Sequence, residues 1–431
     1  MERSTESSSR QNRLIQDIMN KKQLNRKISM KPELLAPAGD LARAKVAINY
    51  GADAVYLGGM SFSLRSHASN FTMEDIREAC KYADAHGANI HVTVNIIPHN
   101  EDFEGLEQYL RDLEEAGVTA IITASVYIMD LAKKVAPKLE VHCSTQMSVT
   151  NSFTAQMLVG ENHVDRVVLA RECSMEEAAE ITAKCPVETE AFIHGGMCVN
   201  ISGRCTLSNR MTLRDANRGG CAQSCRWQYH LMDGNRELST EEDLFTLGSK
   251  DMMAGRQIKQ LMEAGVASLK IEGRMKSEYY VASVVSGYRH LIDELYDCDG
   301  EMSDERMEYH INEITKGANR DICPGFYPKR ADKDTIIFHE YSNNTVNHDF
   351  LGTVVDYNAE TKIAHVQVRN VIEVGDRIEA LMPGKPNAEY DVTWMKNADE
   401  EELTRANKPM DIITMEIPFE VHEKDILRRL S

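Results

Sequence analysis

From Pro32 onward, the chain alternates short apolar runs with longer amphipathic stretches. The apolar runs are rich in β-branched residues, and the amphipathic stretches carry apolar residues at helical spacing and end near a glycine. Glycine favours the left-handed backbone that follows many helices. The pattern predicts eight strands, at Glu33–Ala36, Ala54–Leu57, Ile90–Ile97, Ala120–Thr123, Glu140–His142, Arg166–Ala170, Glu188–Ile193 and Ser268–Glu272.

Helices are predicted between these strands. Examples are Met73–His86, Phe103–Ala116, Met175–Lys184 and Ala254–Ala264, with Gly51, Gly87, Gly117 and Gly265 just past helix ends. Strands that alternate with helices are typical of a parallel sheet, and eight such units predict a closed (β/α)8 barrel of the TIM type. An open doubly wound sheet is the alternative.

The pattern changes after the barrel, which we expect over residues 31–300. Residues 301–345 are predicted to form a helical linker, and residues 346–431 a small antiparallel β-barrel domain. Residues 1–30 are polar and predict a disordered tail. The strands of the last domain are expected at Phe350–Tyr357, Ile363–Arg369, Arg377–Leu381, Tyr390–Met395 and Ile412–Glu416.

Charge limits the possible partners. The 431 residues include 67 acidic and 49 basic side chains, a net charge of -18, which argues against indiscriminate binding to nucleic acid. Any RNA site must therefore be a local basic patch. The sequence has no run of 18 apolar residues and no apolar core of signal-peptide type, so we expect a cytoplasmic protein without a membrane partner.

The strongest chemical signal is a cysteine loop at residues 194–227. It holds four of the ten cysteines, Cys198, Cys205, Cys221 and Cys225. In a chain without an export signal, clustered thiolates suit a metal better than disulfides. Because the gap between Cys198 and Cys205 is too wide for a zinc knuckle, a four-iron cluster is favoured over zinc. Unligated or redox-active cysteines are the third possibility.

The same loop carries an island of positive charge. Its five arginines, Arg204, Arg210, Arg214, Arg218 and Arg226, stand against one acid, Asp215. Arginine forks bind phosphates and carboxylates. The alternative is that these side chains neutralise sulfur charge or cap helix ends.

Other candidates follow the predicted strands, where active sites of such barrels lie. His142 and Gln146 end the fifth strand, and His194, a proton carrier or a structural donor, ends the seventh. Lys270, Glu272 and Arg274 alternate on the eighth strand, so all three are expected to point into the barrel mouth. There Glu272 would pair with one cation and leave the other for a carboxylate or phosphate. The remaining helical cysteines, Cys80, Cys173, Cys185 and Cys298, are expected to be small buried hydrophobes.

The cysteine loop also resembles the signature of the peptidase U32 (collagenase-like) family. The resemblance rests on Glu190-x-Phe192-x-x-Gly195-x-Met197-Cys198, on Gly203-x-Cys205-x-Leu207-Ser208 and on the run Asn217–Trp227. Gly196 departs from the family, which usually has Ser or Ala there. Carried over by position, the resemblance implies a 4Fe-4S iron-sulfur cluster on Cys198, Cys205, Cys221 and Cys225.

The resemblance implies three possible functions. The first is tRNA hydroxylation, which forms 5-hydroxyuridine at the wobble position with prephenate as hydroxyl source and sometimes a paralogous subunit. His142, Gln146, His194 and Glu272 would then be catalytic, and Lys270, Arg274, Arg214 and Arg218 would bind substrate or tRNA. The second is a collagenase-like peptidase, although the sequence has no G-x-S-x-G or H-E-x-x-H motif. The third is a non-catalytic subunit, since Ser125 stands where relatives commonly have Asp.

Overall fold

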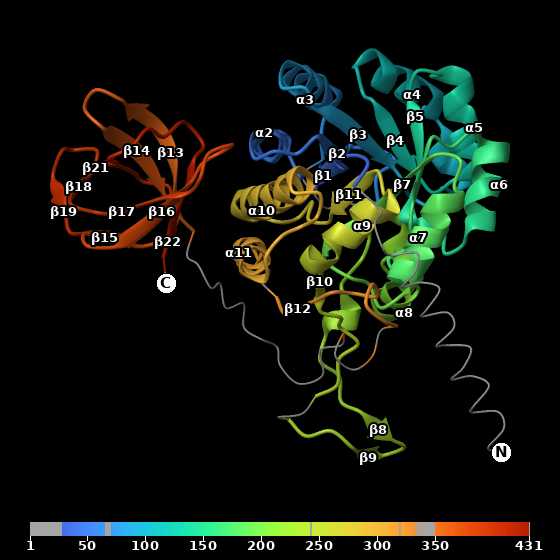
Figure 1. Cartoon of the computed structure of the whole chain (residues 1–431). Coiled ribbons are helices and arrows are strands. Elements are labelled where there is room, and N and C mark those ends of the chain that lie inside the picture. Colours follow the sequence, from blue (N-terminus) through green and yellow to red (C-terminus); the bar gives the residue numbers. More distant parts are fainter. Residues whose placement is uncertain are drawn as a thin grey trace.

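The computed structural model describes residues 28–64, 70–241, 244–318, 320–330, 332, 335 and 350–430. Its larger part is a closed barrel of eight parallel strands (Figure 1), because β7 pairs with β11 and completes the order β11-β1-β2-β3-β4-β5-β6-β7. Closure confirms the predicted (β/α)8 barrel and excludes the open sheet. The strands are β1 (Glu33–Pro37), β2 (Ala54–Gly58), β3 (Asn89–Val94), β4 (Ala120–Thr123), β5 (Glu140–Cys143), β6 (Arg166–Val168), β7 (Glu188–Gly195) and β11 (Ser268–Ile271).

Helices surround the barrel. Residue choice at their ends explains where they start and stop: Thr72 and Asp75 form a capping box, and the predicted glycines have positive φ, 102° at Gly51 and 82° at Gly265. Apolar side chains between helices and strands form the main core. The helices are α2 (Leu41–Asn49), α3 (Met73–Ala85), α4 (Leu106–Glu115), α5 (Val126–Val135), α6 (Ser152–Asn162), α7 (Met175–Lys184), α9 (Ile258–Ala264) and α10 (Glu278–Asp297).

Two additions extend the barrel at the carboxyl end of β7. Strand β10 (Asp251–Met253) pairs antiparallel with it, Met253 opposite His194, and β12 (Ile322–Cys323) continues the sheet. The cysteine loop contains the short helix α8 (Leu207–Thr212) and leads into the hairpin β8 (Met232–Asp233) and β9 (Arg236–Glu237). This hairpin projects away from the barrel (Figure 1).

The C-terminal part is an antiparallel half-barrel that follows α11 (Asp304–Thr315). Eight strands pair in the order β17-β16-β22-β13-β14-β21-β18-β19 around a separate core, and β15 pairs with β20. The strands are β13 (Phe350–Asn358), β14 (Ile363–Val368), β15 (Ile372–Glu373), β16 (Arg377–Leu381), β17 (Ala388–Asp391), β18 (Met395–Lys396), β19 (Glu402–Leu403), β20 (Arg405–Ala406), β21 (Ile412–Glu416) and β22 (Ile426–Arg429).

The two parts are joined by specific contacts. Arg428 is 1 % exposed and its Nη2 lies 2.7 Å from a carboxylate oxygen of Glu313 on α11. Tyr50, which follows α2, donates to the carbonyl of Leu381 at 2.9 Å. No helix of the described residues is long and apolar enough to cross a membrane. Most of the predicted tail, residues 1–27, lies outside the described residues.

Candidate active site at the carboxyl end of the barrel

Arg274 follows β11 and is held rigidly at the carboxyl end of the barrel. It is 4 % exposed, and its guanidinium donates to Ser63 Oγ (3.0 Å), Thr93 Oγ1 (3.1 Å) and Asn70 Oδ1 (3.1 Å). Gly58, the last residue of β2, leaves room for it, because a Cβ there would lie 2.3 Å from Nη2 of Arg274. The site therefore fixes the position of this cation through neutral partners.

A second group of polar side chains lies where β3 and β5 end. Asn95 Nδ2 and Ser144 Oγ both donate to Oε1 of Gln146, at 3.0 and 3.2 Å. Gln146 is 3 % exposed, and its Nε2 is buried without a hydrogen-bond partner among the described residues. Gln146 therefore offers an amide donor in a position fixed by its two neighbours.

His194 ends β7 and is held as a neutral ring. The Tyr288 hydroxyl donates to the carbonyl of Ile193 (3.0 Å), so its oxygen accepts from Nδ1–H of His194 (3.3 Å). This contact leaves the lone pair on Nε2. Burial, helped by the charge of Lys276 and opposed by Glu272, lowers the pKa of His194 to about 3. His194 is therefore an acceptor at neutral pH, and its ring does not carry positive charge.

A carboxylate surrounded by cations lies next to it. Asp251 on β10 is 5 % exposed and contacts Arg226 (3.3 Å), Lys276 (3.6 Å) and Arg320 (3.5 Å). Gly196 lies close by, since a Cβ there would be 3.8 Å from Oδ1 of Asp251 and 3.6 Å from Oε2 of Glu272. The sequence alone did not identify Asp251 and Arg320 as site residues, because only the pairing of β10 with β7 and β12 brings them to the barrel mouth.

The cysteine loop folds back on itself through side-chain to backbone hydrogen bonds. Asn217 accepts from the amide of Cys205 (3.2 Å) and donates to its carbonyl (3.0 Å). Ser208 Oγ accepts from the amide of Ala222 and donates to the carbonyl of Gly220, which places Cys221 beside α8. Helix α8 also packs against the turn 224–226, which contains Cys225. Residues that are distant in the loop are thus gathered around Cys205.

The three other thiols of the loop all influence the pKa of Cys225. Burial raises the pKa of Cys225, Arg226 lowers it, and Cys198, Cys221 and Cys205 each raise it further. All four are free thiols. No group of three or more His, Cys, Asp or Glu within the described ranges is arranged to hold a single metal ion. A tetrahedral zinc site needs its sulfurs about 3.8 Å apart, given Zn–S bonds of about 2.3 Å.

Other cysteines are chemically quieter. Burial raises the pKa of Cys80, Cys143 and Cys173 to about 12, so these side chains remain protonated thiols. For Cys80 and Cys173 this agrees with the predicted role of small buried hydrophobes, whereas Cys185 and Cys298 are only half-buried.

The arginine island divides into two kinds. Arg218 pairs with Asp102, with Nη2 2.9 Å from Oδ1, and Arg226 contacts Asp251. Arg204, Arg210 and Arg214 are exposed and form no ion pair within the part of the chain that the structure describes. The paired arginines match the structural alternative, and the exposed ones are available to an anionic ligand.

Lys270 and His142 lie inside the barrel, not at its mouth as the sequence predicts. Lys270 Nζ donates to Glu190 Oε1 at 2.7 Å and lies over the rings of Tyr56 and Phe192. The predicted alternation of Lys270, Glu272 and Arg274 along one strand is wrong because β11 ends at Ile271. Both Lys270 and His142 come earlier on their strands than the residues at the rim.

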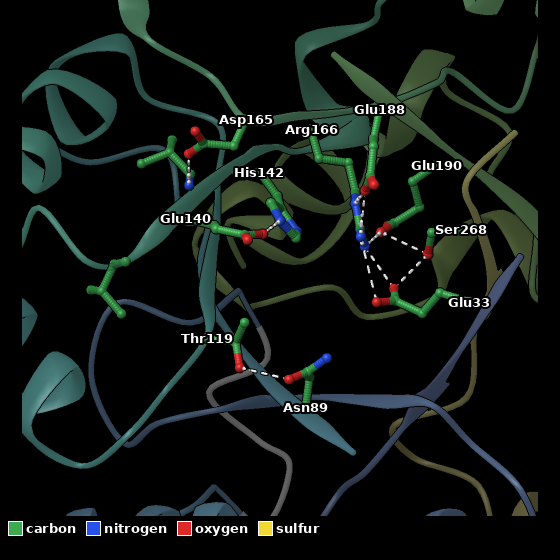
Figure 2. Close-up of polar contacts among 12 residues, drawn as sticks. Glu33, Asn89, Thr119, Glu140, His142, Asp165, Arg166, Glu188, Glu190 and Ser268 are labelled. Atoms are coloured by element: carbon green, nitrogen blue, oxygen red, sulfur yellow. Dashed lines mark hydrogen bonds and ion pairs between the residues drawn. The ribbon is translucent and has the colours of Figure 1, made fainter. Parts of the chain in front are cut away.

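His142 and Glu190, the partner of Lys270, belong to a polar network at the amino end of the barrel (Figure 2). His142 Nε2 lies 3.0 Å from Glu140, and Arg166 contacts Glu33 (2.6 Å) and Glu188 (2.8 Å). A cavity of about 370 Å³ opens there, lined mainly by the first residues of the strands. Active sites of such barrels lie at the carboxyl end of the strands. The ion pairs of this network at the amino end therefore concern stability rather than catalysis.

Comparison with known proteins identifies the family. Residues 39–337 match peptidase family U32, and residues 346–428 match the peptidase family U32 C-terminal domain. The tRNA hydroxylation protein P1 of Bacillus subtilis (strain 168) is 43% identical over 409 residues, 94% of this chain and 96% of that protein.

Two further relatives differ in their named activities. The 23S rRNA 5-hydroxycytidine C2501 synthase of Escherichia coli (strain K12) is 39% identical over 63% of this chain and 41% of its own. A collagenase of Porphyromonas gingivalis (strain ATCC BAA-308 / W83) is 31% identical over 81% of this chain and 86% of its own. The motifs of the cysteine loop and both matches agree: this chain belongs to peptidase family U32.

Proposed function

We propose that this protein hydroxylates tRNA in the cytoplasm, forming 5-hydroxyuridine at the wobble position. Relatives named for tRNA hydroxylation and for 5-hydroxycytidine synthesis in rRNA support a role in RNA hydroxylation. The observation that carries the proposal is that hydrogen bonds fold the loop with its four free thiols back on itself, beside the cations around Asp251 at the barrel mouth. Such an arrangement suits a redox group next to an anionic ligand.

A 4Fe-4S cluster on Cys198, Cys205, Cys221 and Cys225 fits this donor set. The thiols influence one another, yet they are not arranged around one ion. A four-iron cluster places its own irons and sulfides between the thiolates, so it suits wider spacing than zinc does. When bound, such a cluster supplies electron transfer or Lewis acidity. The chain's own part is to hold the thiols, through Asn217 and Ser208, beside the mouth.

The mouth suits a dicarboxylate such as prephenate as hydroxyl source. Three cations, Arg226, Lys276 and Arg320, lie around Asp251, and Lys276 also interacts electrostatically with Glu272. Guanidinium and ammonium groups bind carboxylates through charge-assisted hydrogen bonds, so this concentration of cations suits a ligand with carboxylate groups. Arg274, fixed by Ser63 and Thr93, would orient one of these carboxylates.

Neutral groups complete the proposed site. The Nε2 of Gln146 would donate to an oxygen of substrate, and the neutral ring of His194 would accept a hydrogen bond from substrate through its Nε2. Glu272 would position Lys276 and the ring of His194 electrostatically. His142 and Lys270 are buried inside the barrel and pair with glutamates, so neither is proposed as a reacting group.

Two other functions are weighed against this one. A peptidase is suggested by the collagenase relative, but no Ser or Cys side chain hydrogen-bonds to a His among the described residues, and a nucleophile needs such a base. A non-catalytic subunit paired with a paralogous chain is favoured by Ser125, which lies between β4 and α5 and whose side chain caps no helix amide. If a carboxylate is needed at that position, the partner would have to supply it.

The test uses the full-length protein purified without oxygen. We expect about four irons and four sulfides per chain, a broad visible absorption, and restoration of 5-hydroxyuridine in tRNA of a deletion strain. Cys221→Ser should remove the absorption and the modified nucleoside, while Cys298→Ser, at a half-buried cysteine outside the loop, should change neither. If the protein contains zinc and no iron, or if deletion of its gene leaves the 5-hydroxyuridine content of tRNA unchanged, the proposal is refuted.

A further inference from the structure

Exposed apolar side chains gather on the loops that follow the barrel strands. These loops form one face in a TIM-type barrel. The side chains on this face include the six most exposed large apolar side chains among the described residues: Met60 68 %, Tyr127 57 %, Phe153 79 %, Ile201 66 %, Leu213 93 % and Met275 58 %. Exposed apolar side chains concentrated on one face mark an interaction surface.

Contacts link the aromatic members of this face to the cysteine loop. Arg218 of the loop pairs with Asp102, and the neighbouring Phe103 ring meets Tyr127 edge-on at 5.0 Å. On the other side, Arg204 of the loop lies 3.8 Å from Sδ of Met147, in the turn that precedes α6. Phe153 is in the first turn of α6. Tyr127 and Phe153 thus both lie on elements linked to the cysteine loop, the first through Phe103 and the second through the turn that contains Met147.

Charge decides what kind of partner fits. Three exposed arginines of the loop, Arg204, Arg210 and Arg214, are near Ile201 and Leu213 in the sequence, in a chain with a net charge of -18. Protein interfaces are also rich in aromatic residues and arginine, so the aromatic side chains do not decide the partner by themselves, but exposed arginines without an ion pair among the described residues favour a polyanion. Aromatic rings that stack on bases, next to arginines that bind phosphates, are the usual equipment of sites for unpaired nucleic acid.

We infer that this rim surface, formed by Tyr127, Phe153, Ile201, Leu213 and the three exposed arginines, receives the unpaired loop of the substrate RNA. The inference rests on the proposed function and specifies the shape of RNA that the site accepts. Tyr127 and Phe153 stack on loop bases, and Arg204, Arg210 and Arg214 bind the backbone. A base in a loop reaches the barrel mouth without the cost of opening a duplex, so a paired stem is a poor ligand.

The test compares a fluorescent anticodon stem-loop with a blunt RNA duplex of equal length, both titrated with the full-length protein at several salt concentrations. Phe153→Ala and Tyr127→Ala should each weaken binding of the stem-loop by about tenfold. Their effect on the duplex, and on the slope of log K against log salt, should be negligible because no phosphate contact is lost. Tyr296→Ala, on a 40 % exposed tyrosine near the end of α10, is the matched control and should change nothing.

Each outcome bears on the inference. Unchanged stem-loop affinity in the Phe153 and Tyr127 variants overturns it, and a simultaneous change in oligomeric mass would show that the surface binds a second copy of the chain instead. If wild-type protein restores 5-hydroxyuridine while these variants retain both affinity and activity, the inference fails and the proposed function stands. If wild-type protein neither binds the stem-loop nor restores the nucleoside, both fail.

Discussion

Lys270 and Glu190 form an ion pair of 2.7 Å inside the barrel, where Glu190 is fully buried and Lys270 is 4 % exposed. Removing one partner of such a pair leaves a buried charge, and the nearest other cation, Arg166 at 3.5 Å, already serves Glu33 and Glu188. Lys270→Met should therefore lower the free energy of unfolding by about 3 to 5 kcal/mol.

The matched variant is the double change Lys270→Met with Glu190→Gln, which removes both charges. It should recover most of the lost stability, measured by urea unfolding in a double-mutant cycle. Equal destabilisation of the single and double variants would mean that the loss comes from packing against Tyr56 and Phe192 rather than from charge.

Asp425 should make the stability of the C-terminal half-barrel depend on pH. It is 1 % exposed, and burial raises its pKa to about 6. Because the folded pKa lies above that of the unfolded chain, at about 4, its contribution to stability is present below pH 4 and is lost as pH rises through 6. The loss should approach about 3 kcal/mol, from about two pKa units.

Asp425→Asn isolates this effect. The amide oxygen can still accept from the amide of His422, as the carboxylate does at 2.8 Å. The variant should match wild type in urea midpoint near pH 4 and exceed it at pH 7. A constant difference between the two proteins across this range would contradict the assignment.

Gly58 should control the position of Arg274. A Cβ at residue 58 would lie 2.3 Å from Nη2 of Arg274 and 2.4 Å from Oγ of Ser63, so Gly58→Ala must displace this cation. If Arg274 binds a carboxylate in the reaction, Gly58→Ala and Arg274→Ala should both abolish 5-hydroxyuridine formation while the visible absorption expected of the proposed cluster remains.

The control for Gly58→Ala is Gly160→Ala in α6, where an added Cβ has no atom within 4 Å. Its nucleoside content and absorption should equal those of wild type. Activity that survives Gly58→Ala would remove Arg274 from the substrate site. Joint loss of activity and absorption would instead make Arg274 a structural residue.

The sequence predicted the barrel because strand and helix periodicity is a local property. Each of the eight strands was located within a few residues, and the cysteine loop was correctly placed after β7. The depth of a side chain inside the barrel is not local, since it depends on where each strand ends and how the strands are staggered. This is why Lys270 and His142 were expected at the mouth.

Partners that are distant in sequence were equally hidden. Asp251 contacts Arg320 only because β10 and β12 pair beside β7. Arg218 pairs with Asp102, which lies 116 residues away in the sequence. Composition revealed the arginine island but could not divide it into paired and exposed members. That division required the loop after β3 to be placed next to the cysteine loop.

Arg214 and Arg218 should therefore differ in effect although both belong to the island. Arg214 is exposed and without an ion pair among the described residues, so Arg214→Ala should weaken RNA binding and reduce the slope of log K against log salt by about 0.7 to 0.9, one phosphate contact. Arg214→Lys keeps the charge and should keep the slope. Arg218 is paired with Asp102, so the main effects of Arg218→Ala should be a lower thermal midpoint and a lower iron content. A lowered salt slope with unchanged midpoint in Arg218→Ala would show that RNA displaces Asp102 from this arginine.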